Sequence, residues 1–84
     1  MRLVWDRSAW EDYTYWQAAD RTVLKRINAL IDACLLDPFT GIGKPEQLKH
    51  TLGGVWSRRI TQEHRLVYVV RDDDIVMLQA RYHY

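Results

Sequence analysis

The spacing of the apolar residues changes near the middle of the chain, and this change limits the folds that the sequence can adopt. Between Val23 and Leu35 apolar residues recur at intervals of three and four, which is typical of an amphipathic helix. From Val55 to His83 bulky β-forming residues alternate with polar ones, which is typical of strands with one buried face. Asp37-Pro38 ends the helical pattern, because the residue before a proline avoids the helical conformation. We therefore expect helices followed by a sheet.

Local signals place the remaining elements. Arg2–Trp5 is apolar enough for one strand, and Asp6-Arg7-Ser8 follows with side chains that cap helices. Ser8 and Glu11 have the spacing of a capping box, so we expect the first helix to begin there, and Asp20 is the expected N-cap of the second. Three strand-like runs follow, at Val55–Thr61, His64–Arg71 and Ile75–His83. This order predicts an α+β fold: an N-terminal strand, a two-helix hairpin, and an antiparallel sheet with the helices packed on one face.

The length and composition predict one small folded unit. A chain of 84 residues suits a single domain spanning residues 1–84, and 48% hydrophobic residues are enough for a packed core. The single cysteine, Cys34, lies on the apolar side of the second helix, so we expect a buried small side chain and no disulfide. The sequence shows no leader and no run of about 18 apolar residues. We expect a cytoplasmic protein that does not bind membranes.

Alternation along the strand-like runs assigns their two faces. The face expected to pack on the helices carries Trp56, Ile60, Leu66, Tyr68, Val70, Val76, Leu78 and Ala80. The opposite face carries Ser57, Arg59, Arg65, Gln79, Arg81 and His83. Three strands thus direct cations or imidazole to one surface, and the window from Lys44 to Leu66 holds five Lys and Arg residues against two acidic ones. The alternative interpretation is a solvated face with ordinary surface charges.

The residues of that surface suit RNA cleavage by attack of the 2′-OH on the neighbouring phosphate. This reaction needs a base for the hydroxyl, cations for the phosphate, and an acid for the leaving 5′-oxygen. Glu46, in an expected loop, can be the base, and His83 the acid, because imidazole titrates near neutrality. Lys49, Arg59 and Arg65 can stabilise charge, and Tyr82 or Tyr84 can orient the phosphate or stack on a base.

The sequence predicts no metal and no cofactor. No set of cysteine, histidine or carboxylate residues has the spacing of metal ligands, which disfavours a metal mechanism. The three acids Asp72-Asp73-Asp74 lack a second cluster and the pattern of a calcium loop, so we expect a solvated turn.

Short strings along the whole chain resemble the YoeB family of mRNA-cleaving toxins, within the RelE/ParE superfamily. They are Val4-Trp5, Asp12-Tyr13, Tyr15-Trp16, Asp37-Pro38-Phe39, Gly43-Lys44-Pro45-Glu46, Leu48-Lys49-His50, Trp56-Ser57-Arg58-Arg59-Ile60-Thr61, Glu63-His64-Arg65-Leu66-Val67-Tyr68 and Arg81-Tyr82-His83-Tyr84. The string from Trp56 to Ile60 and the last four residues are the most specific of these.

The resemblance implies a ribosome-dependent endoribonuclease that cuts mRNA in the decoding site of the 70S ribosome. It also implies a homodimer and an inhibiting antitoxin of the YefM/Phd type. By this resemblance Glu46 is the general base and His83 the general acid. The residues that stabilise the phosphate are Lys49, Arg59 and Arg65, and Tyr84 is a functional terminal tyrosine.

Six further residues are candidates for RNA contact: Lys44, His50, Arg58, His64, Arg81 and Tyr82. For the two histidines a structural role is the alternative, and the two arginines can pair with acids instead. Two other functions also remain open. A gyrase-poisoning toxin of the ParE type would share the fold without needing the pair Glu46 and His83, and a non-enzymatic RNA-binding module would tolerate the loss of both.

Overall fold

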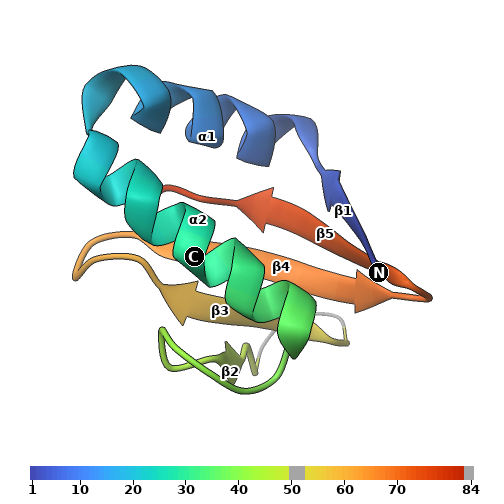
Figure 1. The fold of residues 1–84 in the computed structure, drawn as a ribbon. Helices are drawn as coiled ribbons and strands as arrows, with labels where there is room; N and C mark the ends of the chain where they lie inside the picture. Colours follow the sequence, from blue (N-terminus) through green and yellow to red (C-terminus); the bar gives the residue numbers. More distant parts are fainter. Residues whose placement is uncertain (50–52, 83–84) are drawn as a thin grey trace.

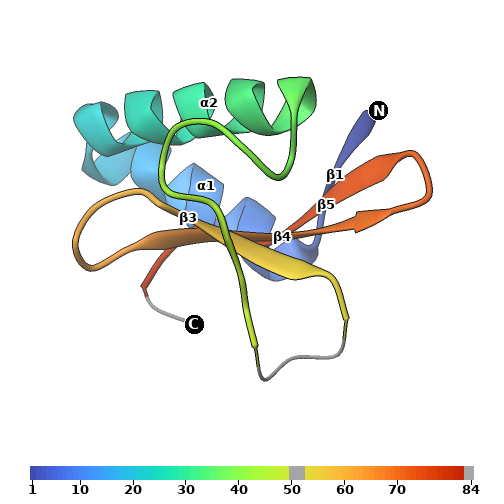
Figure 2. The ribbon, with the colours of Figure 1, turned by 90° about the horizontal axis from the view of Figure 1, so that it is seen from below.

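The computed structural model describes residues 1–49 and 53–82 of the chain. Its elements are β1 (Arg2–Trp5), α1 (Arg7–Ala19), α2 (Arg21–Leu36), β2 (Glu46–Gln47), β3 (Val55–Arg59), β4 (Arg65–Arg71) and β5 (Asp74–Gln79) (Figure 1). The strands form one sheet in the order β1-β5-β4-β3-β2. Both helices lie on the same side of this sheet (Figure 2). The expected α+β fold is therefore confirmed.

The sheet is mixed, because β1 runs parallel to β5 while β2, β3, β4 and β5 pair antiparallel in sequence order. Arg2 lies opposite Asp74 in the parallel pair, and its Nε is 2.8 Å from Asp74 Oδ1. The hydrogen bond from Arg2 lowers the pKa of the Asp74 carboxyl group. Asp72 and Asp73 form the turn before it, as expected for a solvated acidic connection. The ion pair between Arg2 and Asp74 therefore links β1 to β5.

Aspartates define the ends of both helices. Asp20 caps α2, since its side chain accepts hydrogen bonds from the backbone N–H groups of Thr22 and Val23. The N-cap of α1 is Asp6, whose carboxylate accepts from the N–H of Ser8. The predicted capping box at Ser8 is wrong, because Ser8 already lies inside α1.

The core fills the space between the helices and one face of the sheet. Its buried members are Ala9 and Trp16 from α1, Ile27, Leu30, Ile31 and Cys34 from α2, and Ile60, Leu66, Tyr68, Ile75, Met77 and Ala80 from the strands and their ends. Cys34 is fully buried, as expected, and burial raises the pKa of its thiol. The core side of β3 and β4 agrees with the sequence alternation.

The expected core residues of β5 are wrong at two positions. Ile75 and Met77 are fully buried, while Val76 and Leu78 are only partly buried. Val67 pairs with Gln79 and Tyr68 with Met77, so the register shifts at this point and Leu78 has no pairing partner. Such a bulge inserts one residue and reverses the faces of the alternation.

The strand β5 is also shorter than the expected run to His83. It ends at Gln79, so Arg81 lies beyond the strand, and His83 lies outside the described residues.

Arg58 is a fully buried cation on the core side of β3. Its Nε donates a hydrogen bond of 3.1 Å to the hydroxyl oxygen of Tyr68, which itself donates to the carbonyl of Pro38 at 2.6 Å. The two terminal nitrogens donate to the loop after α2, reaching the carbonyl oxygens of Asp37, Thr40 and Ile42 at 2.7 to 2.9 Å. One side chain therefore attaches the whole loop to the sheet.

Replacing Arg58 with methionine should lower the free energy of unfolding by about 3 kcal/mol or more, because several buried acceptors lose their donors. Urea denaturation monitored by circular dichroism measures the change. Arg71→Met is the matched control, since Arg71 is exposed at the end of β4 and its loss should change stability by about 0.5 kcal/mol at most. Equal stability of the two variants would contradict the structural role of Arg58.

Gly43 lies where the same loop passes closely between α2 and β3. Its φ is +85°, and its carbonyl oxygen accepts a 2.7 Å hydrogen bond from the N–H of Arg59. A Cβ atom here would lie 2.6 Å from Leu30 Cδ2 and 3.1 Å from Arg58 Cβ. Gly54 has nearly the same φ, +83°, but its nearest neighbour would be 3.9 Å away. Of these two glycines, Gly43 is thus restricted by packing as well as by backbone conformation, and Gly54 by backbone conformation alone.

This difference predicts that Gly43→Ala destabilises the protein more than Gly54→Ala. Both substitutions place a side chain in the left-handed region, which costs about 1–2 kcal/mol. Gly43→Ala should cost about 1–3 kcal/mol in addition, because Leu30 or the loop must move. Thermal denaturation of the two variants side by side measures this difference, and identical melting temperatures would show that the close approach is unimportant.

Candidate active site

The central pair of the candidate site is Glu46 and Arg65. The sequence predicted a loop at Glu46, and this prediction is wrong. Glu46 lies in β2, where it pairs with Ser57 of β3. Arg65 begins β4 on the other side of β3, and its Nη1 lies 3.3 Å from Glu46 Oε1. The Arg65 side chain is 18% exposed and the Glu46 side chain 63%. The carboxylate is therefore held by a largely buried cation yet remains accessible to a substrate.

Arg59 adds a second cation on the same face. It pairs directly with Arg65 in the β3–β4 register, so the two side chains leave the sheet on one side, and Arg59 is exposed. Like charges directly opposite each other destabilise a sheet, and a bound anion would relieve the repulsion. Two guanidinium groups can also offer paired N–H donors to phosphate oxygens.

Lys49 lies at the same surface hollow as Glu46. A hollow in the surface is lined by Glu46, Gln47, Leu48 and Lys49, so the lysine and the carboxylate share one opening. Lys44 is exposed in the loop before β2 and does not line this hollow. Of the six expected catalytic residues, the structure thus brings together Glu46, Arg59 and Arg65 on one face, and Lys49 shares a hollow with Glu46.

Two of the expected catalytic residues, His83 and Tyr84, and one expected RNA contact, His50, lie outside the described residues. The general acid therefore stays a prediction from the sequence. The described chain ends at Tyr82, which is 54% exposed.

Arg58 is not part of this face. It is fully buried and donates to carbonyl groups and to Tyr68, so the prediction that it contacts RNA is wrong. Of the acids, Asp37 is close enough for Arg58 to act on it, since the hydrogen bond from the N–H of Phe39 and also the charge of Arg58 lower the pKa of the Asp37 carboxyl group. The alternation that places Trp56 and Ile60 inside also places Arg58 inside. The sequence pattern therefore contained the signal for its structural role.

His64 and Arg81 contact the aromatic rings of α1 and of Tyr82. The ring of His64 lies between Trp16 and Tyr82, and its Nδ1 accepts a 2.7 Å hydrogen bond from the N–H of Tyr82. The guanidinium of Arg81 lies 3.6 Å from the ring centre of Tyr15 in α1, a cation–π contact. In this structure His64 and Arg81 organise the segment that follows β5.

Ser57 is a residue of this face to which the sequence assigned no role. It is fully buried opposite Glu46, and within the described chain its hydroxyl has no hydrogen-bond partner. The alternation placed Ser57 on the open face but gave no sign that its hydroxyl would be unpaired.

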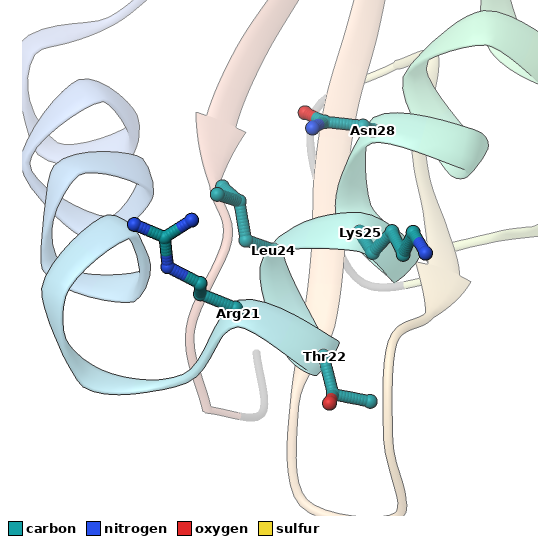
Figure 3. Close-up of a pocket in the computed structure, with 5 residues that line it drawn as sticks. All are labelled: Arg21, Thr22, Leu24, Lys25 and Asn28. Atoms are coloured by element: carbon teal, nitrogen blue, oxygen red, sulfur yellow. The ribbon is translucent and has the colours of Figure 1, made fainter.

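A second pocket lies at the start of α2, lined by Arg21, Thr22, Leu24, Lys25 and Asn28 (Figure 3). It contains two cations but no carboxylate and no imidazole among its lining residues, so it lacks the groups for acid–base catalysis.

Two observations concern other classes of site. Residues 1–49 and 53–82 contain no group of three or more histidine, cysteine or acidic side chains that could hold a metal ion. Neither α1 nor α2, the two helices of the described ranges, has the length and apolar character needed to cross a membrane.

Comparison with known proteins extends over nearly all of the chain. Residues 5–84 match the family model for the YoeB-like toxin of bacterial type II toxin-antitoxin systems. Toxin YoeB of Escherichia coli K12 is 55% identical over 84 residues and covers all of both chains.

Solved structures agree with this result. A YoeB/ParE toxin from Agrobacterium tumefaciens is 48% identical and superimposes with a TM-score of 0.95 over all of both chains. The YoeB dimer from Staphylococcus aureus is 44% identical with a TM-score of 0.92, and the YoeB-YefM complex from the same organism is 42% identical with a TM-score of 0.89. Each covers 100% of this chain and 98% of the other. Because the family model and these relatives span almost the entire sequence, the chain belongs to the YoeB-like toxins of bacterial type II toxin-antitoxin systems.

Proposed function

We propose that this toxin is a ribosome-dependent endoribonuclease, which cleaves mRNA in the ribosomal A site without a metal ion and so stops translation. The observation that carries the proposal is the contact between Glu46 and Arg65, with Arg59 paired beside them on the same face. A carboxylate next to two guanidinium groups provides a proton acceptor and phosphate-binding donors in one place.

In the proposed reaction Glu46 accepts the proton of the 2′-OH, which then attacks the adjacent phosphorus. Its exposed carboxylate can reach a substrate, while Arg65 holds one of its oxygens. Arg59, Arg65 and Lys49 stabilise the additional negative charge that develops on the phosphate oxygens. His83 gives a proton to the departing 5′-oxygen, and Tyr84 assists at the chain end. The products are a 2′,3′-cyclic phosphate end and a free 5′-OH, and water can then open the cyclic phosphate to a 3′-phosphate.

We propose that the toxin forms a homodimer and is inhibited by an antitoxin of the YefM type. The Staphylococcus aureus relatives, solved as a dimer and as a complex with YefM, support both. The inhibiting segment of the antitoxin should either cover the face of Glu46, Arg59 and Arg65 or displace the chain end from Arg81 onward. Acidic or aromatic residues in that segment would suit the cations of the face.

Cleavage of mRNA on programmed 70S ribosomes tests the acid–base assignment. We expect the wild type to cut in the A site and Glu46→Gln and His83→Gln each to reduce the cleavage rate at least about 100-fold at equal ribosome occupancy. Glu11→Gln is the matched control, because Glu11 is also an exposed carboxylate beside an arginine, Arg7, but lies on α1. Its rate should equal that of the wild type.

Loss of stability does not explain the expected loss of rate. The Glu46–Arg65 pair is open to water on the Glu46 side, and such pairs contribute about 1 kcal/mol or less to folding. Glu46→Gln should therefore unfold within that margin of the wild type. Persistent cleavage by both glutamine variants would refute the assigned roles.

The same experiment separates the alternative functions. A wild type that never cuts mRNA but inhibits gyrase supercoiling would indicate a ParE-type poison. A protein that binds ribosomes without cutting would indicate an RNA-binding module.

A further inference from the structure

The segment that follows β5 is bound at its main-chain atoms by side chains from several distant elements. Ala80 N–H donates to Asp12 and its carbonyl accepts from the indole of Trp16, at 3.0 and 2.8 Å. The Gln79 side chain donates to the carbonyl of Arg81 at 2.7 Å. Tyr82 is held on both sides, since its carbonyl accepts from the N–H of Arg65 at 3.1 Å and its N–H donates to His64 Nδ1 at 2.7 Å.

The backbone of Tyr82 explains why such strong support is needed. Its φ is +64°, in the left-handed region that residues other than glycine rarely occupy. A residue keeps such a conformation only where its surroundings impose it. The hydrogen bonds on both sides of Tyr82 do so, and they define the direction of the chain at the residue directly before His83.

The hydrogen bond from Tyr82 to His64 also indicates which ring nitrogen of His64 carries the proton. A nitrogen that accepts from a backbone N–H must present its lone pair, so this bond requires the ring proton to lie on Nε2 and not on Nδ1. The ring is held edge-on against Trp16, with a centroid distance of 4.8 Å, and lies 5.0 Å from the ring of Tyr82. The N–H of His64 donates to the hydroxyl of Thr61, which further restricts the loop that carries the ring.

We propose that His64 is a positioning residue: its Nδ1 anchors the amide of Tyr82 and thereby directs the chain end that carries the proposed general acid. The catalytic consequence rests on the proposed nuclease function, whereas the anchoring itself does not. This role differs from an RNA contact, because the acceptor nitrogen is already used within the protein.

Three substitutions of His64 distinguish the effect of the hydrogen-bond acceptor from the effect of the ring's packing. The Oδ1 atom of asparagine lies as many bonds from the backbone as Nδ1, so His64→Asn keeps an acceptor in place. His64→Gln moves the acceptor one bond further out, and His64→Ala removes it. Hydrogen exchange of the Tyr82 amide, followed by NMR on the full chain, should accelerate about fivefold or more in the Ala and Gln variants, the equivalent of one hydrogen bond. In the Asn variant it should stay close to the wild-type rate.

Cleavage on ribosomes gives the second measurement. We expect the single-turnover rate to fall about tenfold or more in the Ala and Gln variants, because a small displacement of a catalytic group is costly. Ribosome affinity should stay unchanged and the Asn variant should recover most of the rate. An RNA contact would instead lower affinity without recovery by asparagine, and this result would overturn the proposal. Equal losses in all three variants would also overturn it, because they would show that only the packing of the ring matters.

The wild type alone provides a check that does not depend on the folding of any variant. Nitrogen-15 NMR of His64 should show the proton on Nε2, and a proton on Nδ1 would refute the anchor. If the wild type does not cleave mRNA but the Tyr82 amide still depends on the acceptor, the nuclease function and the catalytic consequence fail while the anchor stands. If the wild type cleaves and His64→Ala changes neither the amide nor the rate, the anchor fails while the nuclease stands.

Discussion

The buried guanidinium of Arg58 is the interaction on which the rest of the structure depends. A buried cation is tolerated only when acceptors surround it, and here the carbonyl groups of the loop after α2 and the hydroxyl of Tyr68 supply them. These bonds attach the loop to the sheet between the end of α2 and the start of β2. Because β2 carries Glu46, the same bonds determine where the proposed base enters the sheet. A core residue thus sets the geometry of the open face.

Two side chains beside Arg58, those of Tyr68 and Cys34, are kept neutral by burial. Burial raises the pKa of the Tyr68 hydroxyl and of the Cys34 thiol, so both remain protonated near neutral pH. The hydrogen bonds of the Arg58 guanidinium go to carbonyl and hydroxyl oxygens, whereas Arg65, on the opposite face, contacts the exposed carboxylate of Glu46. Arg58 and Arg59 are neighbours in β3 but lie on different faces of the sheet, because successive side chains of a strand point to opposite faces. Arg58 is buried in the core, and Arg59 is exposed on the opposite face, where we propose that the substrate binds.

The helix ends, the strand β5 and the candidate site show which features could be predicted from the sequence. The cap at Asp20, the helix end at Asp37 and the burial of Cys34 were predicted, because each depends on a local signal or on the period of one helix. The capping box at Ser8 was wrong, since Asp6 competes for the same role two residues earlier. The core face of β5 was wrong at Val76 and Leu78, because a bulge reverses the alternation and no residue type marks it. In the candidate site the residues were named from the sequence, but the contact of Glu46 with Arg65 required the pairing of β2 with β3.

The sequence by itself determined the α+β class, the two helices and the Asp20 cap of the second, and the gathering of Arg59 and Arg65 on one face of a hairpin. These features follow from periodicity and from short-range chemistry, which act along a few neighbouring residues. Only the tertiary structure decided that β1 runs parallel to β5, that Arg65 contacts Glu46, and that His64 holds the amide of Tyr82. Each of these contacts joins residues far apart in the sequence or depends on what fills the space beside a side chain. These contacts form only when the chain is packed, so the pattern of residues along the sequence does not reveal them.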